Sequence, residues 1–133
     1  MSSHDIRMLL TTIPLFEGLP SQQLDALAKR GKFVEYKGGD PILWESEATS
    51  AFYLLISGSV KLYKSSPDGK EQTLYVLGPG EPFCLCSRLV CDTFPANAAA
   101  LKKSRILLFP YEIIEEIARK DPSILFTFLA ILS

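Results

Sequence analysis

The chain has 133 residues, of which 47% are hydrophobic and 22% are charged, and its formal net charge is -1. These values indicate one globular domain with enough apolar side chains to build its own core. A chain that binds the phosphate backbone of nucleic acid by itself needs a basic surface, so this charge argues against that function.

The N-terminal sequence and the number of cysteines indicate the cellular compartment of the protein. No apolar run follows a basic segment at the N-terminus, so we expect no signal peptide. No stretch reaches the roughly 20 apolar residues that cross a bilayer. The three cysteines, Cys84, Cys86 and Cys91, are an odd number in one short segment, which is a poor disulfide framework. These features predict a cytoplasmic protein.

Helices are predicted at the beginning of the chain. Residues 5–11 are compatible with a short helix. A clearer helix begins at Ser21, which is a good N-cap residue, and places Leu24, Leu27 and Ala28 on one face. Gly31 suits the position after its last turn.

The middle of the chain has the pattern of short strands. Apolar runs are separated by turn residues, and Pro67, Asp68 and Gly69 are typical of a hairpin turn. Strands at this spacing indicate an antiparallel sandwich or barrel, so the predicted fold class is mainly β with flanking helices. The eight runs are residues 33–36, 41–44, 52–56, 60–63, 73–77, 83–85, 96–101 and 106–109.

The chain returns to helix at its end. Ile113, Ile114 and Ile117 follow helical spacing, and Asp121 with Pro122 is typical of the start of another helix. Because the last residues are apolar nearly all round, we interpret 1–121 as a domain and 122–133 as the start of a truncated dimerisation helix. The alternative is a terminal helix packed on its own sheet. The expected dimer contacts are Leu125, Phe128, Leu129 and Leu132.

Four segments in order carry a family resemblance: IPLFEGLPSQQLDALA, GGDPILWESE, FYLLISGSVKLY and LGPGEPF. Together they resemble the effector domain of the CRP/FNR superfamily of transcription regulators, over about residues 13–133. The resemblance implies a β-roll of the cyclic nucleotide-binding type, which is a double-stranded β-helix or jelly-roll. One departure is Ser46, where relatives often have glycine. The resemblance also implies that DNA is bound only through a C-terminal domain that these residues do not contain.

Residues 80–101, here called the effector segment, depart from the cyclic nucleotide pattern. In the family a Gly-Glu pair binds the ribose and an Arg-Ser pair binds the phosphate. The first pair falls on Cys84 and Leu85, and the second falls on Phe94 and Pro95, or on Pro95 and Ala96 with a shifted gap. A buried phosphate without a guanidinium or an equivalent set of donors is costly, so we expect an effector other than a cyclic nucleotide.

An apolar pocket is predicted instead. Arg88 is the one arginine of the segment, and we expect it on the surface rather than on a phosphate. Trp44 is expected in the core of the roll or at its rim. The predicted effector-pocket residues are Gly80, Glu81, Phe83, Cys84, Leu85, Cys86, Arg88, Leu89, Phe94, Pro95, Ala96 and Asn97.

The cysteines leave several readings open. The GEPFCLCS stretch is similar to the haem-thiolate segment of the carbon-monoxide-sensing family member, with Cys84 at its cysteine ligand. A redox switch between Cys91 and Cys86 is an alternative. A zinc site formed by the three cysteines and His4 is a further alternative. The cysteines also suit a purely structural role as small buried apolar residues. The cofactor is therefore undetermined.

The functional prediction is a sensory domain of a CRP/FNR-type regulator, in a homodimer, with a small-molecule effector. The alternatives are a genuine module for cAMP or cGMP, with backbone amides and Arg88 on the phosphate, and a regulatory or scaffold domain without a ligand. His4 is the only histidine and the chain has no pattern of a Ser-His-Asp set, so we expect no enzyme activity.

Overall fold

The computed structural model describes residues 2–48, 51–83 and 96–123. Contacts along the chain divide it into two units. The helical unit contains residues 1–32 and 109–133, and the β unit contains residues 33–108. The helical unit is therefore built from both ends of the chain, whereas the β unit is continuous in sequence.

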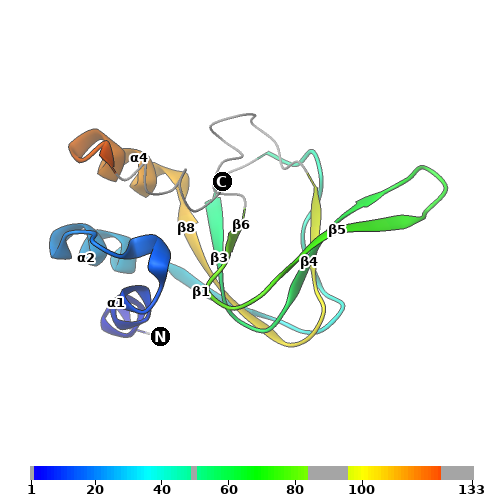
Figure 1. Cartoon of the computed structure of the whole chain (residues 1–133), viewed down its shortest axis with the longest axis horizontal. Coiled ribbons are helices and arrows are strands. Elements are labelled where there is room, and N and C mark those ends of the chain that lie inside the picture. The colour runs from blue at the N-terminus through cyan, green and yellow to red at the C-terminus, as the bar shows by residue number, and fades with distance from the viewer. Residues whose placement is uncertain (1, 49–50, 84–95, 124–133) are drawn as a thin grey trace. The chain divides into compact units, whose positions relative to one another are not determined.

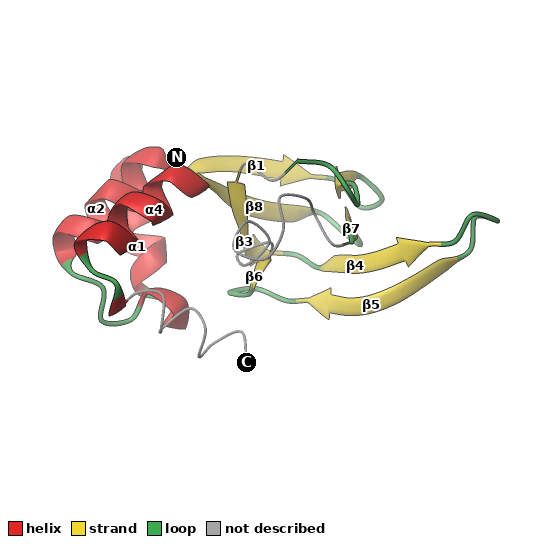
Figure 2. Cartoon of the chain, turned by 90° about the horizontal axis from the view of Figure 1, so that it is seen from above, coloured by secondary structure: helices red, strands yellow, loops and turns green. Residues whose placement is uncertain are grey.

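The helical unit contains α1 (Ser3–Thr11), the short 3-10 helix η1 (Pro14–Phe16), α2 (Ser21–Arg30) and α4 (Tyr111–Lys120). Figure 2 shows α1, α2 and α4 lying together. Each of the three has an apolar stripe, as the helical spacing predicts, and α2 packs against both α1 and α4. The buried residues of these stripes are Ile6, Leu10, Leu24, Leu27, Ala28, Ile113, Ile114 and Ile117.

The helix starts show how local sequence sets the boundaries. A capping box closes α1, because Ser2 Oγ accepts from Asp5 N at 3.2 Å and Asp5 Oδ2 accepts from Ser2 N at 3.3 Å. The prediction that Ser21 caps α2 is wrong: Pro20 stands at the cap, and Ser21 is the first helical residue. Ser21 Oγ instead accepts a hydrogen bond from Arg7 Nη2 at 2.5 Å.

Each of the eight predicted runs overlaps a strand in the described residues, although the run 83–85 does so only at Phe83, and this confirms the mainly β class. They form two four-stranded sheets, with the orders β1-β8-β3-β6 and β2-β7-β4-β5. The pairings β2–β7, β4–β7, β4–β5 and β3–β6 are antiparallel. The strands are β1 (Lys32–Tyr36), β2 (Pro41–Leu43), β3 (Ala51–Ser57), β4 (Val60–Ser65), β5 (Glu71–Leu77), β6 (Pro82–Phe83), β7 (Asn97–Ala100) and β8 (Ser104–Pro110).

The core of the β unit draws on both sheets. Its members are Leu43, Leu55, Val60, Leu77, Phe83, Ala98 and Ile106. Burial of each Leu, Val, Ile or Phe side chain contributes about 1.5–3 kcal/mol relative to leaving it in water. Trp44 does not belong to it, since 51% of its surface is exposed, so of the two expected places for Trp44 the core is excluded.

The hairpin of β4 and β5 is the one that Pro67, Asp68 and Gly69 predict. Figure 1 shows it as two long paired strands. Its turn is closed by Ser66 N donating to Lys70 O at 2.8 Å and by Gly69 N donating to Ser66 O at 2.9 Å. The last part of β5 presents apolar side chains to solvent, because Leu74, Tyr75 and Val76 are each about half exposed.

A tight contact joins the turn after β3 to the turn before β8. Gly58 has a φ of 104°, and a Cβ built on it would lie 2.6 Å from Lys103 O and from Ser104 Cα. Ser104 is fully buried; its hydroxyl donates to Lys102 O at 2.8 Å and accepts from Ser59 N at 3.1 Å. Glycine is required here both for the backbone angle and for the space.

The start of the predicted last helix lies at the edge of the described residues. Asp121 Oδ1 accepts from Ser123 N at 3.1 Å, as an N-cap residue does, which agrees with the predicted role of Asp121. Residues 124–133 lie outside the described residues, so the predicted dimer contacts at Leu125, Phe128, Leu129 and Leu132 stay predictions. Within the described parts, no helix is long and apolar enough to cross a membrane.

Candidate functional site

The structure describes the two flanks of the effector segment, residues 80–83 and 96–101. Residues 84–95 lie outside the described residues. The predictions for Cys84, Leu85, Cys86, Arg88, Leu89, Cys91, Phe94 and Pro95 all fall there.

The first flank is held against β3. Gly80 has a φ of 89°, and its N donates to Leu55 O at 2.7 Å. Leu55 N in turn donates to Glu81 O at 3.0 Å. The antiparallel pairing of β6 with β3 then places Phe83 opposite Tyr53. These bonds fix the path of the chain up to the point where Cys84 follows.

The carboxylate of Glu81 is used within the loop between β5 and β6. Glu81 Oε1 accepts from the Tyr75 hydroxyl at 2.8 Å, and Oε2 accepts from Gly78 N at 2.5 Å. The hydrogen bond to the carboxylate and its negative charge both raise the pKa of the Tyr75 phenol. Glu81 therefore holds the loop that leads into the effector segment.

Phe83 is part of the core of the β unit. Only 3% of its surface is exposed, and its ring centroid lies 5.0 Å from that of Tyr53. Offset aromatic pairs at this separation are favourable. If Phe83 lines the effector pocket, it therefore does so as a buried side chain of the core.

The second flank is strand β7, whose residues are all buried. It lies between β2 and β4, with Asn97 opposite Tyr63 and Ala98 opposite Leu62. Asn97 is 7% exposed, and its Oδ1 accepts from Glu45 N at 2.7 Å. The amide of Asn97 thereby fixes the turn that follows β2.

The fold brings the two flanks into one core. Phe83 from the first sheet and Ala98 from the second belong to the same buried cluster, together with Leu55. The flanks of residues 84–95 are thus anchored on both sheets. The sequence predicts one site for Gly80, Glu81, Phe83, Ala96 and Asn97, which all lie on these flanks.

Two residues that position these flanks were not predicted from the sequence. The Tyr75 hydroxyl donates a hydrogen bond to Glu81, and the backbone N–H of Glu45 donates one to Asn97 Oδ1. The polar pair of Tyr75 and Glu81 lies only six residues apart across a Gly-Pro-Gly turn, which is a usable signal. The bond between Glu45 and Asn97 leaves no such signal, because any residue offers a backbone N–H.

A metal site is not formed by the described residues. Among residues 2–48, 51–83 and 96–123, no three His, Cys, Asp or Glu side chains gather closely enough to hold an ion. The cysteines lie outside these ranges, so the haem, redox and zinc readings stay predictions.

Comparison with known proteins places this fold. The family described as cyclic nucleotide-binding domain matches residues 33–121. The sensor domain of the transcriptional regulator DNR from Pseudomonas aeruginosa superposes with a TM-score of 0.88 at 27% identity, covering 98% of this chain and 87% of that one.

Two full-length relatives extend this result. The chain is 32% identical to the cyclic AMP receptor protein of Thermus thermophilus, over 90% of this chain and 56% of the relative. It is 32% identical to a CRP-like cAMP-activated global transcriptional regulator of Mycobacterium tuberculosis, over 69% of this chain and 40% of the relative. The chain thus spans about half the length of these relatives.

The chain therefore belongs to the cyclic nucleotide-binding domain family. Within it, the chain is an effector domain of the CRP/FNR type of transcription regulator. The resemblance and the β-roll fold that the sequence predicts are confirmed.

Proposed function

We propose that this domain senses an effector other than a cyclic nucleotide, through the effector segment. The observation that carries the proposal is the chemistry of the segment and its flanks. By the family resemblance, the Gly-Glu pair falls on Cys84 and Leu85, and the Arg-Ser pair falls on Phe94 and Pro95, or on Pro95 and Ala96 with a shifted gap. No residue of the described flanks from Gly80 to Phe83 and from Ala96 to Ala100 is basic.

Electrostatics argues against phosphate in such a place. The one charged residue of those flanks is Glu81, and a carboxylate repels a phosphate. An unpaired anion out of water costs several kcal/mol, and a neutral, largely apolar effector avoids that cost. The buried Phe83, Ala96 and Ala98 support an apolar lining of this kind.

Haem is the cofactor that these residues suit best. Cys84, which directly follows the buried Phe83, would hold the iron as a thiolate, and the apolar flanks would contact the ring. When bound, haem would supply an iron centre able to bind a gas. The protein would exclude water and orient the thiolate. The alternative use of Cys86 and Cys91 as a redox pair needs no cofactor.

An absorption spectrum of the purified chain with and without added haem tests this proposal. A Soret band that is lost on Cys84→Ala and kept on Cys91→Ala supports thiolate ligation by Cys84. A band that is unchanged in both variants contradicts it. An absence of haem uptake by the wild-type chain also contradicts the haem version.

Cyclic nucleotide binding is the second candidate, favoured by the relative named as a cyclic AMP receptor protein. In that case backbone amides and Arg88 would contact the phosphate. Calorimetry with cAMP and with cGMP decides between the two candidates. Binding in the low micromolar range that weakens on Arg88→Ala would overturn the proposal of a different effector.

We further propose that the whole protein is a cytoplasmic homodimer without enzyme activity. The dimer would form through Leu125, Phe128, Leu129 and Leu132, and DNA would be bound by a further domain beyond these residues. The names of two matches, a global transcriptional regulator and the sensor domain of a transcriptional regulator, support the part of this proposal that concerns DNA. Effector binding would then shift the terminal helix between two arrangements.

A further inference from the structure

Three turns of the β unit are fixed against one another. The turn between β7 and β8 is tied to the turn after β3, because Leu101 N donates to Ser59 O at 2.8 Å. It also touches the turn after β1, since a Cβ built on Gly38 would lie 3.1 Å from Lys102 Cα. The close contact at Gly58 holds the same place. The side chains of these turns therefore stand on a well-defined backbone.

These turns carry lysines that have no acidic partner. Lys37, Lys102 and Lys103 are all exposed, and within the described residues none of them forms an ion pair. The one carboxylate of the three turns is that of Asp40, which accepts from Lys37 N at 2.8 Å. With three lysines and one aspartate, the turns have a formal charge of +2, although the whole chain has a formal charge of -1. Since a lysine stem is flexible, ammonium groups on touching turns can contact one partner.

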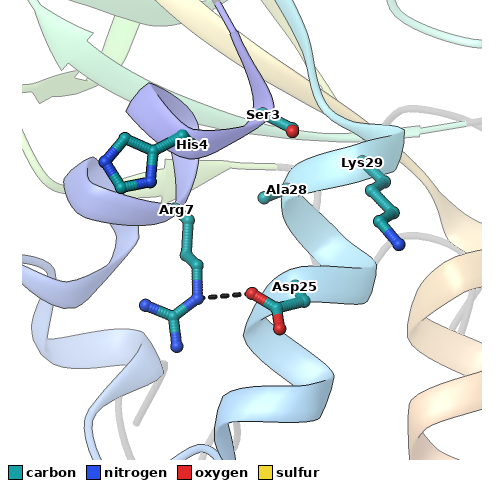
Figure 3. Close-up of a pocket in the computed structure, with 6 residues that line it drawn as sticks. All are labelled: Ser3, His4, Arg7, Asp25, Ala28 and Lys29. Carbon is teal, nitrogen blue, oxygen red and sulfur yellow. Dashed lines mark hydrogen bonds and ion pairs between the residues drawn. The ribbon is translucent and has the colours of Figure 1, made fainter.

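The hollow between α1 and α2 in the helical unit offers no comparable surface. Arg7 is one of its cations, and Arg7 Nε donates to Asp25 Oδ1 at 2.5 Å, so its charge is already neutralised. Figure 3 shows the Lys29 ammonium on the far side of α2 from Arg7. The cations of that hollow are therefore separated or paired, whereas those of the three turns are neither.

An exposed apolar side chain lies among these charges. Leu101 directly precedes Lys102, and 49% of its surface is exposed. An apolar centre with a polar rim is the usual composition of a protein–protein interface. Because hydrogen bonds already fix the backbone of the turn, little conformational freedom is lost there when a partner binds.

We propose that Lys37, Leu101, Lys102 and Lys103, here called the basic turn surface, dock an acidic segment of another protein that carries an apolar side chain. Charge complementarity selects carboxylates for the lysines, and Leu101 selects an apolar neighbour for them. A nucleic acid backbone would match the lysines but not Leu101, and the net charge of the chain disfavours it. The proposal does not rest on the identity of the effector.

Nuclear magnetic resonance on the 133-residue chain tests this proposal. The probe is a synthetic peptide in which leucines alternate with pairs of glutamates, and the reference is the same peptide with glutamine in place of glutamate. We expect saturable amide shifts centred on residues 37–40 and 101–104 with the acidic peptide alone. Absence of saturation, or equal shifts with the glutamine peptide, overturns the proposal. Tighter binding of a short DNA duplex at the same residues also overturns it.

Two double variants separate a docking surface from general attraction. Lys102→Ala with Lys103→Ala should weaken binding of the acidic peptide by about tenfold, which is within the range of two exposed charges. Lys70→Ala with Lys120→Ala removes the same charge from exposed positions elsewhere and should leave binding unchanged. Leu101→Gln keeps every charge and should weaken binding by about threefold. Equal weakening by the two double variants, or full binding by Leu101→Gln, overturns the proposal.

Discussion

The Tyr75 hydroxyl lies 2.8 Å from Glu81 Oε1, and this bond ties strand β5 to the loop that enters the effector segment. The other oxygen of the same carboxylate accepts from Gly78 N at 2.5 Å. One side chain therefore holds both sides of a Gly-Pro-Gly turn. The bond joins the exposed apolar end of β5 to the flank that precedes Cys84.

The first prediction concerns the pKa of Tyr75. Because the Glu81 carboxylate accepts a hydrogen bond from the phenol and is negatively charged, the folded chain holds this pKa above the ordinary value of 10.0. Glu81→Gln keeps an acceptor without charge, and Glu81→Ala removes both. We expect the pKa to fall from wild type to Gln to Ala in a titration of the tyrosine ring carbons. Glu71→Ala, on the same strand, should leave it unchanged.

The same shift has a consequence for stability. The raised pKa means that the folded state favours the protonated phenol more than the unfolded state does. This contribution is fully present below pH 10 and is lost as the pH rises through the folded pKa. Denaturant unfolding at a series of alkaline pH values should therefore show a smaller alkaline loss for Glu81→Ala. An identical loss in the variant and the wild type would count against the link.

The second prediction tests the structural role of Asn97. Asn97→Ala leaves the Glu45 N–H without its buried partner, which should cost about 1–3 kcal/mol in the free energy of unfolding. Glu45→Ala keeps the backbone N–H and removes only an exposed ion pair with Lys64, so it should cost less than about 1 kcal/mol. Chemical denaturation measures both. Equal costs would contradict the role of the amide.

The third prediction concerns Gly58. Gly58→Ala adds a Cβ against Ser104 and Lys103 O and forces an L-residue to a φ of 104°, so it should destabilise the fold by about 3 kcal/mol. Gly69 has a φ of 85° but open space around it, so Gly69→Ala should cost only about 1 kcal/mol. The difference between the two, measured by thermal unfolding, isolates the packing contribution.

The fourth prediction concerns Ser46, where the family resemblance leads us to expect glycine. Its φ is 71°, a left-handed conformation in which a side chain is strained. Relief of that strain, less the backbone entropy of glycine, should make Ser46→Gly more stable by about 0.5 kcal/mol. Ser59→Gly makes the same change where φ is not positive and should be destabilising. A loss of stability in Ser46→Gly would reject this explanation.

The fifth prediction addresses assembly. Leu125, Leu129 and Leu132 lie on the apolar terminal segment that we expect to pair two copies of the chain. Their replacement by glutamine should give a monomer in sedimentation velocity. Leu74→Gln, on the exposed face of β5, serves as a control that removes an apolar side chain elsewhere. Unchanged dimerisation in the triple variant would show that another surface forms the dimer.

Much of the fold follows from local pattern. The hairpin at Asp68, the apolar face of Leu24 and Leu27 and the cap at Asp121 are where the sequence predicts, and each predicted strand overlaps an observed one. Side-chain period and turn residues act over a few positions, so they can be recognised without the tertiary structure. The predicted cap at Ser21 is one residue away from the observed cap at Pro20, because a local pattern fixes a helix boundary only to within one or two residues.

For the candidate site, too, one part can be predicted from the sequence and another part cannot. The sequence by itself decides that the side chains at Cys84, Leu85, Phe94 and Pro95 carry no positive charge, and that they occupy the family's ligand positions stays a prediction. Only the tertiary structure decided that Glu81 binds Tyr75 and that Asn97 binds Glu45. Those bonds depend on which strands lie side by side, and a short stretch of sequence does not contain that information.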